Sequence, residues 1–237
     1  MAASVRHVDA AGSPNPLPGA DVPVVSRTLP WLLVVGGLVG LIAAAALLVE
    51  RIRVLADPDH VPACSFNPVL SCGTVMVTPQ AEVFGVPNPL VGVACFAVVT
   101  AVGAALLART ELGTGARTGQ GTVLGSGADL GFRRWFWLGL QAGCLFGVVF
   151  VHWLIFQSLY RIGALCPYCM VVWAVTIPLF WYVTLHNLRS GHVPVPNALR
   201  RPIGVLARNH TVVLTVWGVV IAGAVAEAFW SYWTTLL

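Results

Sequence analysis

Two pairs of cysteines are the residues of this chain best suited to chemistry. Cys64 and Cys72 lie in a polar segment, and Cys166 and Cys169 form a Cys-Pro-Tyr-Cys motif at the start of an apolar run. A thiolate can attack a disulfide sulfur, so two such pairs on one side of a membrane can pass electrons between them. The apolar run gives the second pair access to a lipid-soluble oxidant. The two pairs therefore predict thiol–disulfide exchange at a membrane surface.

The Cys-Pro-Tyr-Cys motif has the features of a reactive helix N-terminus. Pro167 suits the first helical position, where its missing N–H would have no partner in any case. The free N–H groups and the positive end of the helix dipole stabilise a thiolate and lower the pKa of a cysteine there. Three-residue spacing places both sulfurs on one face, with Cys169 one turn deeper. We expect Cys166 to meet other sulfurs and Cys169 to meet a membrane-borne oxidant.

The first pair flanks Asn67-Pro68, a turn-forming dipeptide. The turn can bring Cys64 and Cys72 together as an exposed loop disulfide that a partner protein reaches, and a mobile loop can swing Cys72 toward Cys166. The alternative is a static disulfide that only staples the loop. That alternative leaves the second pair without an electron donor, so we favour exchange. The competing interpretations of the second pair are a structural disulfide, half of a zinc site that all four cysteines could complete, and a chance occurrence of the motif.

Other reactive or ionisable side chains fall inside apolar runs. Cys95 and Cys144 are expected to pack as small buried residues, the common role of free cysteine. An ionisable group within a membrane is a functional candidate. For His152 and Glu227 we nevertheless favour hydrogen bonds between helices over catalysis.

The composition excludes a soluble globular protein. The 237 residues are 57% hydrophobic and 9% charged, whereas soluble domains carry about 25% charged residues. The mean hydropathy of +0.83 points the same way. The net charge of +4 is spread over several loops and forms no basic stripe, which disfavours nucleic-acid binding. The bilayer and its lipid are therefore the solvent of this chain.

Five apolar stretches reach the length of about 20 residues that a membrane helix needs. Backbone groups in lipid must pair within their own segment, so the stretches predict helices and an all-α membrane protein. The predicted spans are 29–48, 89–108, 135–160, 166–185 and 211–233.

The arginines predict the orientation. Ten of them lie in the N-terminal tail and in residues 109–134 and 186–210, against three in residues 50–86 and 161–165. The positive-inside rule then places the N-terminus in the cytoplasm and both cysteine pairs on the extracytoplasmic side of the cytoplasmic (inner) membrane. Disulfides form and persist on that side.

The chain divides into three parts along its length. Residues 1–28 are rich in Pro, Gly, Ala and Asp and predict a disordered cytoplasmic tail. Residues 29–186 hold the first four spans, with the extracytoplasmic redox loop at 50–86. Residues 187–237 hold a cytoplasmic loop and the fifth span. Residues 111–131, rich in Gly and Thr, predict a flexible linker.

Several motifs follow one another in a distinctive order. Cys64 and Cys72 have seven residues between them, Gly-Thr-Val-Met follows, then Pro87-Asn88-Pro89-Leu-Val-Gly92, then Cys-Pro-Tyr-Cys. In order, spacing and common side these motifs resemble bacterial members of the vitamin K epoxide reductase family, over residues 29–186. The resemblance implies a four-helix transmembrane bundle around a quinone (menaquinone or ubiquinone), to which this chain adds a fifth transmembrane helix.

The resemblance also implies a role for each cysteine. Cys169 reacts with the quinone, and Cys166 exchanges with Cys72. Cys64 exchanges with an extracytoplasmic thioredoxin-like (DsbA-like) partner. Some members carry a fused thioredoxin-like domain after the fifth helix, but this sequence stops at Leu237, so a separate partner is expected.

Two further residues occupy quinone-binding positions of the family. Asn88 stands where an Asn hydrogen-bonds a quinone oxygen. Trp173 stands where Tyr is frequent, and its indole N–H donates but cannot accept. Aromatic side chains are expected either to line the pocket or to pack beside it, and these are Phe84, Trp153, Phe156 and Tyr168.

The predicted function is a quinone-dependent thiol–disulfide oxidoreductase that supports disulfide bond formation. Three alternatives remain at this point. They are a membrane protein that binds or transports metal through four cysteines, a membrane scaffold with two structural disulfides, and the same fold acting as a quinone epoxide reductase.

Overall fold

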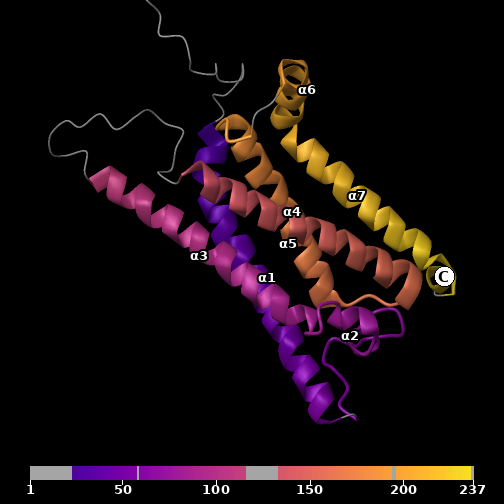
Figure 1. Cartoon of the computed structure of the whole chain (residues 1–237). Helices are drawn as coiled ribbons and strands as arrows, with labels where there is room; N and C mark the ends of the chain where they lie inside the picture. The colour runs from indigo at the N-terminus through magenta and orange to yellow at the C-terminus, as the bar shows by residue number, and fades with distance from the viewer. Residues whose placement is uncertain (1–22, 58, 116–132, 194–195, 236–237) are drawn as a thin grey trace, which may run out of the picture.

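The computed structural model describes residues 23–57, 59–115, 133–193 and 196–235. Five helices in these ranges are long and apolar enough to cross a membrane (Figure 1). They are α1 (Pro23–Ala56), α3 (Asn88–Gly115), α4 (Arg134–Gln157), α5 (Pro167–Arg189) and α7 (His210–Ala228). The described residues form no strand beyond one bridged pair. The predicted all-α membrane fold is therefore confirmed.

Glycines let α1 and α3 pack very closely. A Cβ atom on Gly40 would lie 2.4 Å from the Phe96 ring, and one on Gly103 would lie 2.7 Å from the Val34 backbone nitrogen. Small residues at such crossings let two membrane helices approach until their backbones touch. The first and second membrane helices therefore form one rigid unit, against which α5 also packs.

The third membrane helix, α4, stands apart from α3. α4 packs mainly against α5 and makes far fewer contacts with α3. It carries Gly139 and Gly143 on the side that faces α3, and a Cβ atom on either glycine would meet nothing within 4 Å. The tight α1–α3 pair and the open α3–α4 side together leave room for a cavity.

The loop between α1 and α3 is shorter and more structured than the sequence predicted. α1 continues to Ala56, eight residues beyond the predicted span, because polar side chains in its last turns bond to the loop. The loop itself contains α2 (Cys72–Met76) and a 3-10 turn, η1 (Pro79–Glu82). We call the end of the bundle that carries residues 59–87 and 163–166 the thiol end (Figure 1).

Two other boundaries also differ from the predictions. α1 begins at Pro23, inside the predicted tail, and residues 1–22 lie outside the described residues. α3 runs on to Gly115, the first part of the predicted linker, and residues 116–132 also lie outside the described residues. The predicted loop after α5 contains a helix, α6 (Asn197–Arg208).

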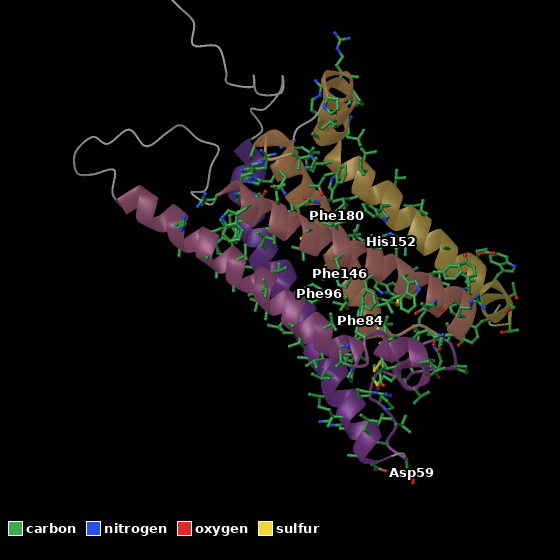
Figure 2. The ribbon with its side chains drawn as sticks, viewed as in Figure 1. Asp59, Phe84, Phe96, Phe146, His152 and Phe180 are labelled. Atoms are coloured by element: carbon green, nitrogen blue, oxygen red, sulfur yellow. A yellow bond between two sulfur atoms is a disulfide. The ribbon has the colours of Figure 1, made fainter. Side chains whose placement is uncertain are left out.

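The fifth membrane helix is joined to the bundle by a few polar contacts. The Trp217 indole N–H of α7 donates to His152 Nε2 of α4 at 2.9 Å, so the other hydrogen sits on Nδ1 and is donated to the Val148 carbonyl (Figure 2). At the thiol end the Tyr160 hydroxyl donates to Glu227 at 3.4 Å. Both His152 and Glu227 therefore make the contacts between helices that we expected.

Candidate functional site

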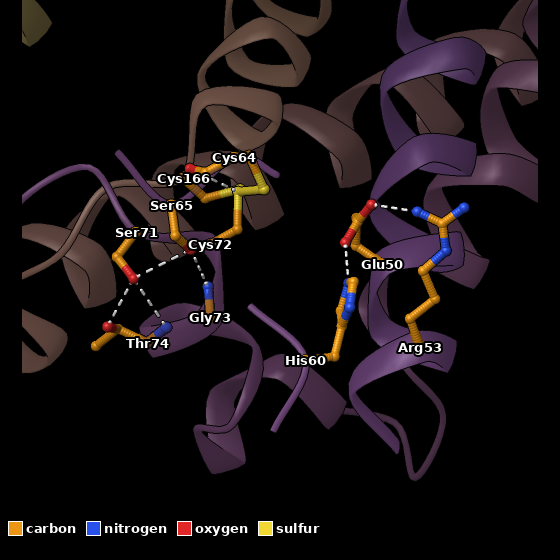
Figure 3. The surroundings of a disulfide bond; sticks show 10 residues. All are labelled: Glu50, Arg53, His60, Cys64, Ser65, Ser71, Cys72, Gly73, Thr74 and Cys166. Atoms are coloured by element: carbon orange, nitrogen blue, oxygen red, sulfur yellow. Dashed lines mark hydrogen bonds and ion pairs between the residues drawn. A yellow bond between two sulfur atoms is a disulfide. The ribbon is translucent and has the colours of Figure 1, made fainter. Parts of the chain in front are cut away.

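Three of the four predicted catalytic sulfurs lie in contact at the thiol end. Cys64 and Cys72 form a disulfide, and the Cys72 sulfur lies 3.2 Å from the Cys166 sulfur (Figure 3). Cys166 and Cys169 are free thiols. A separation of about 3–3.5 Å is what reacting atoms need before attack. The geometry therefore supports direct exchange between Cys72 and Cys166.

A backbone bridge brings Cys72 and Cys166 side by side. The Ser71 N–H donates to the Leu165 carbonyl at 2.9 Å, and the Leu165 N–H donates to the Val69 carbonyl at 2.7 Å. Each bridged segment runs directly into one of the two cysteines, so the register of the bridge fixes the distance between the sulfurs. Nothing in the sequence around Leu165 indicated this pairing.

The predicted turn between the first two cysteines is present. The Asn67 side-chain oxygen accepts the N–H groups of Val69 and Leu70, at 3.0 and 2.7 Å. Asn favours such turns because its side chain replaces a backbone acceptor. Ser71 then caps α2, and its hydroxyl accepts the Thr74 N–H at 3.3 Å. The turn and the cap place Cys72 as the first residue of α2.

The first pair differs from the prediction in its exposure. Cys64 is only 3% exposed and Cys72 is fully buried, so the predicted exposed loop disulfide is wrong. The sulfurs are enclosed by Leu47 of α1, by Met76 of α2 and by the start of α5. Cys72 also needs no swing toward Cys166, since the two sulfurs already touch.

Cys166 is the N-cap residue of α5, as predicted, with Pro167 at the first helical position. The thiol of Cys169 donates to the Cys166 sulfur, and this hydrogen bond is the largest cause of a lowered pKa at Cys166. The backbone N–H groups of Cys169 and Tyr168 add to it, whereas burial opposes it. The helix N-terminus therefore favours the thiolate of Cys166.

An apolar cavity of about 580 Å³ begins at the second cysteine pair. Cys166 and Cys169 lie in its wall, and it extends between α3 and α4 as far as Trp135 and Phe136. Most of the lining residues are apolar, and Val is the most frequent among them. A cavity of this size and polarity suits a drug-sized apolar ligand with few polar groups.

Both residues that the resemblance assigned to quinone binding border this cavity. The Trp173 side chain is 4% exposed, and its indole nitrogen is buried without a hydrogen-bond partner in the described structure. Asn88 already donates to the Gln80 carbonyl at 2.7 Å and accepts the Val83 N–H at 3.2 Å. Asn88 thus supports the loop, and one of its amide hydrogens remains for a ligand.

The aromatic residues of the cavity wall are not the four named from the sequence. The Phe84 ring packs at a tilt against Phe146 and Phe150 of α4, at centroid distances of 6.1 and 5.7 Å (Figure 2). Neither Phe84 nor Trp153, which stacks on Phe150, lines the cavity. The lining aromatics are Phe96, Trp135, Phe136, Phe146, Phe150 and Trp173. Periodicity alone could not show which face of α4 meets the cavity.

Cys95 and Cys144 are also found in the cavity wall. Cys144 is 8% exposed and belongs to the core, as expected, whereas Cys95 is exposed. Neither forms a disulfide.

A cluster around Glu50 was not predicted from the sequence. This carboxylate is buried at the end of α1 and bonds to His60 and Arg53 (Figure 3). Glu50 ends an apolar run, so its charge indicated only the end of a membrane span. A buried carboxylate must be paired, but the sequence does not show with what.

Comparison with known proteins agrees with this geometry. A family model described as the vitamin K epoxide reductase family matches residues 31–184, which include all four cysteines of the site. No curated protein matches the chain. The chain belongs to the vitamin K epoxide reductase family and is an oxidoreductase of the membrane.

Proposed function

We propose that this protein is a quinone-dependent thiol–disulfide oxidoreductase that takes electrons from an extracytoplasmic thioredoxin-like protein and so supports disulfide bond formation. The observation that carries the proposal is the row of sulfurs. The Cys64–Cys72 disulfide touches Cys166, and Cys169 follows it in the wall of an apolar cavity. Electrons can pass along this row from the loop to the cavity by exchange between neighbouring sulfurs.

The first exchange reduces the loop pair. A thiolate of the partner attacks Cys64, which breaks the Cys64–Cys72 bond and frees the Cys72 thiolate. The second partner thiolate then displaces Cys64, so the partner leaves as a disulfide. Two electrons have moved from the partner to Cys64 and Cys72.

The second exchange passes the electrons inward. The Cys72 thiolate attacks Cys166 of an oxidised Cys166–Cys169 pair across the 3.2 Å contact, and Cys169 leaves as a thiolate. Cys64 then attacks Cys72, which restores the loop disulfide and releases Cys166. A leaving thiol of low pKa leaves faster, and the pKa of Cys166 is lowered by the Cys169 thiol and by two backbone N–H groups. The described structure, with an intact loop disulfide and two inner thiols, matches the end of this step.

The cavity residues fit a quinone. A quinone held there would accept two electrons and two protons, while Cys166 and Cys169 return to a disulfide. The Trp173 N–H suits a carbonyl oxygen, because a buried donor without a partner costs about 1–3 kcal/mol. Asn88 offers its remaining amide hydrogen. The open side between α3 and α4 lets an apolar chain extend into the bilayer.

The arginine distribution supports an extracytoplasmic position for the thiol end. Ten arginines against three favour a cytoplasmic N-terminus, and an odd number of spans then places the C-terminus on the same side as the cysteines. A four-cysteine metal site is disfavoured by its donors, since two of the four sulfurs are bonded to each other.

The proposal is tested with the purified full chain in detergent, a reduced thioredoxin-like protein and menaquinone, followed by quinone absorbance. We expect loss of oxidised quinone with the wild type and none with Cys169→Ala, which still exchanges in part with the partner. Cys64→Ala should keep quinone reduction by a small dithiol and lose it with the protein partner. Trp173→Phe should raise the KM for the quinone about tenfold, the effect of one hydrogen bond lost from a buried site.

Two results would contradict the proposal. If no dithiol donor leads to loss of oxidised quinone, the oxidoreductase is not quinone-dependent. If Cys64→Ala leaves oxidation of the protein partner unchanged, the order of the cysteines is wrong.

A further inference from the structure

The carboxylate of Glu50 holds residues 60–63, which precede Cys64 in the sequence, against α1. The Glu50 side chain is only 9% exposed, and its Oε2 atom accepts a hydrogen bond from His60 Nε2 at 3.0 Å (Figure 3). The backbone N–H of Ala63 also donates to Glu50. Oε1 accepts from Arg53 of the same helix at 2.9 Å. Glu50 therefore contacts both the start and the end of residues 60–63.

Residues 60–63 lead directly into the loop disulfide and pack beside Cys72. Pro62 is buried, and a methyl group on Gly73, next to Cys72, would meet its Cδ atom at 3.5 Å. Cys64 directly follows this segment and is 3% exposed. Within the described part of the loop, the side-chain hydrogen bonds that join residues 59–63 to α1 all end on Glu50. We call residues 60–63 the cover of the loop disulfide and Glu50 its fastening.

The contacts of Glu50 with residues 60–63 stand against access of an outside thiol to the Cys64 sulfur. A partner thiolate must reach the Cys64 sulfur to begin exchange, and accessibility is a condition of the reaction. As the structure stands, the sulfur is enclosed. The contact between Cys72 and Cys166 depends on the Leu165 bridge instead, so it can persist while the cover moves.

We propose that Glu50 is a positioning residue that holds residues 60–63 closed over the loop disulfide. An outside thiol reaches Cys64 when the contacts of Glu50 with His60 and Ala63 break. The proposal deepens the proposed function, since it says how the thioredoxin-like partner gains entry, and it rests on that function only for the identity of the partner.

The test measures access to the disulfide without any quinone or partner. The purified full chain, wild type or Glu50→Gln, is treated with tris(2-carboxyethyl)phosphine, a water-soluble reductant. The free thiols of Cys64 and Cys72 are then counted by alkylation and peptide mass spectrometry over time. We expect reduction to be about tenfold faster in Glu50→Gln, the factor that corresponds to a lost hydrogen bond to a charged group. Equal rates in the two proteins would overturn the proposal.

Two variants test the assignment to individual contacts. His60→Phe keeps a ring at this position but removes the hydrogen bond to Glu50, and should give a smaller acceleration in the same direction. Arg53→Gln is the matched control, because Arg53 belongs to α1 and pairs with Glu50, and no hydrogen bond among the described residues joins it to residues 60–63. Arg53→Gln could accelerate reduction as much as Glu50→Gln does. In that case the charge of the cluster, and not the contacts of Glu50 with residues 60–63, sets the rate of reduction, and the proposal fails.

A second readout separates positioning from general loss of structure. In a Cys64→Ala background, mild oxidation should link Cys72 to Cys166, because their sulfurs lie 3.2 Å apart. Adding Glu50→Gln should leave the yield of this link unchanged. A lower yield would mean that Glu50 supports the whole thiol end, which contradicts the proposal. Because no quinone takes part, a negative result here is distinct from failure of quinone reduction.

Discussion

The two sulfurs of the loop disulfide are held in place by different means. Cys72 follows a backbone bridge to Leu165, whose two hydrogen bonds set its distance from Cys166. Cys64 follows a segment that is fastened through the side chain of Glu50. Backbone hydrogen bonds persist through side-chain motion, whereas a side-chain fastening opens locally at smaller free energy. In the mechanism that we propose, the backbone fixes the geometry of the inner exchange, and one carboxylate controls the outer exchange.

Removal of the backbone bridge should have the largest effect on the contact between the Cys72 and Cys166 sulfurs. Leu165→Pro deletes the N–H that donates to Val69, so the Cys72 and Cys166 sulfurs should move apart. We expect the rate of quinone reduction to fall roughly 100-fold, the effect of about 1 Å of misplacement. The measurement is quinone absorbance with a small dithiol as donor.

Leu165→Val is the matched control for this prediction. It keeps the backbone N–H and a buried apolar side chain, so the rate should stay near that of the wild type. A Leu165→Pro protein that reduces quinone as fast as Leu165→Val would show that the bridge does not set the sulfur distance.

A smaller effect is expected in the pH dependence of alkylation at Cys166. The Cys169 thiol is the largest cause of the lowered pKa of Cys166, so the thiolate of Cys166 persists to lower pH than that of an ordinary cysteine. In the reduced protein, the alkylation rate of Cys166 by iodoacetamide should have its midpoint below about pH 8.5. In Cys169→Ala the midpoint should move upward. A midpoint that stays the same in both proteins would contradict the assigned cause.

The smallest effect is expected from the cap of α2. Ser71→Ala removes the acceptor of the Thr74 N–H but leaves both hydrogen bonds of the bridge. Loss of an N-cap costs about 1 kcal/mol, so quinone reduction with a small dithiol should slow by no more than about fivefold. A loss as large as that of Leu165→Pro would mean that α2, and not the bridge, positions Cys72.

Much of the fold was predictable because membrane helices are specified locally. Length and apolarity within each stretch identified the five spans, and Pro167 indicated where α5 begins. The Asn67 turn was equally local. The helix ends were less accurate: α1 runs on to Ala56 because its last charged residues find partners in the loop, far along the sequence.

The sequence alone determined the reactive groups and the kind of solvent around them. It supplied two cysteine pairs, an apolar environment and a helix N-terminus at Cys166. Only the tertiary structure decided that the Cys72 and Cys166 sulfurs touch, that the loop disulfide is covered, and that the Trp173 N–H borders a cavity. The physical reason is distance along the chain. Patterns in sequence report on neighbours within a few turns, whereas these contacts join residues up to 94 positions apart.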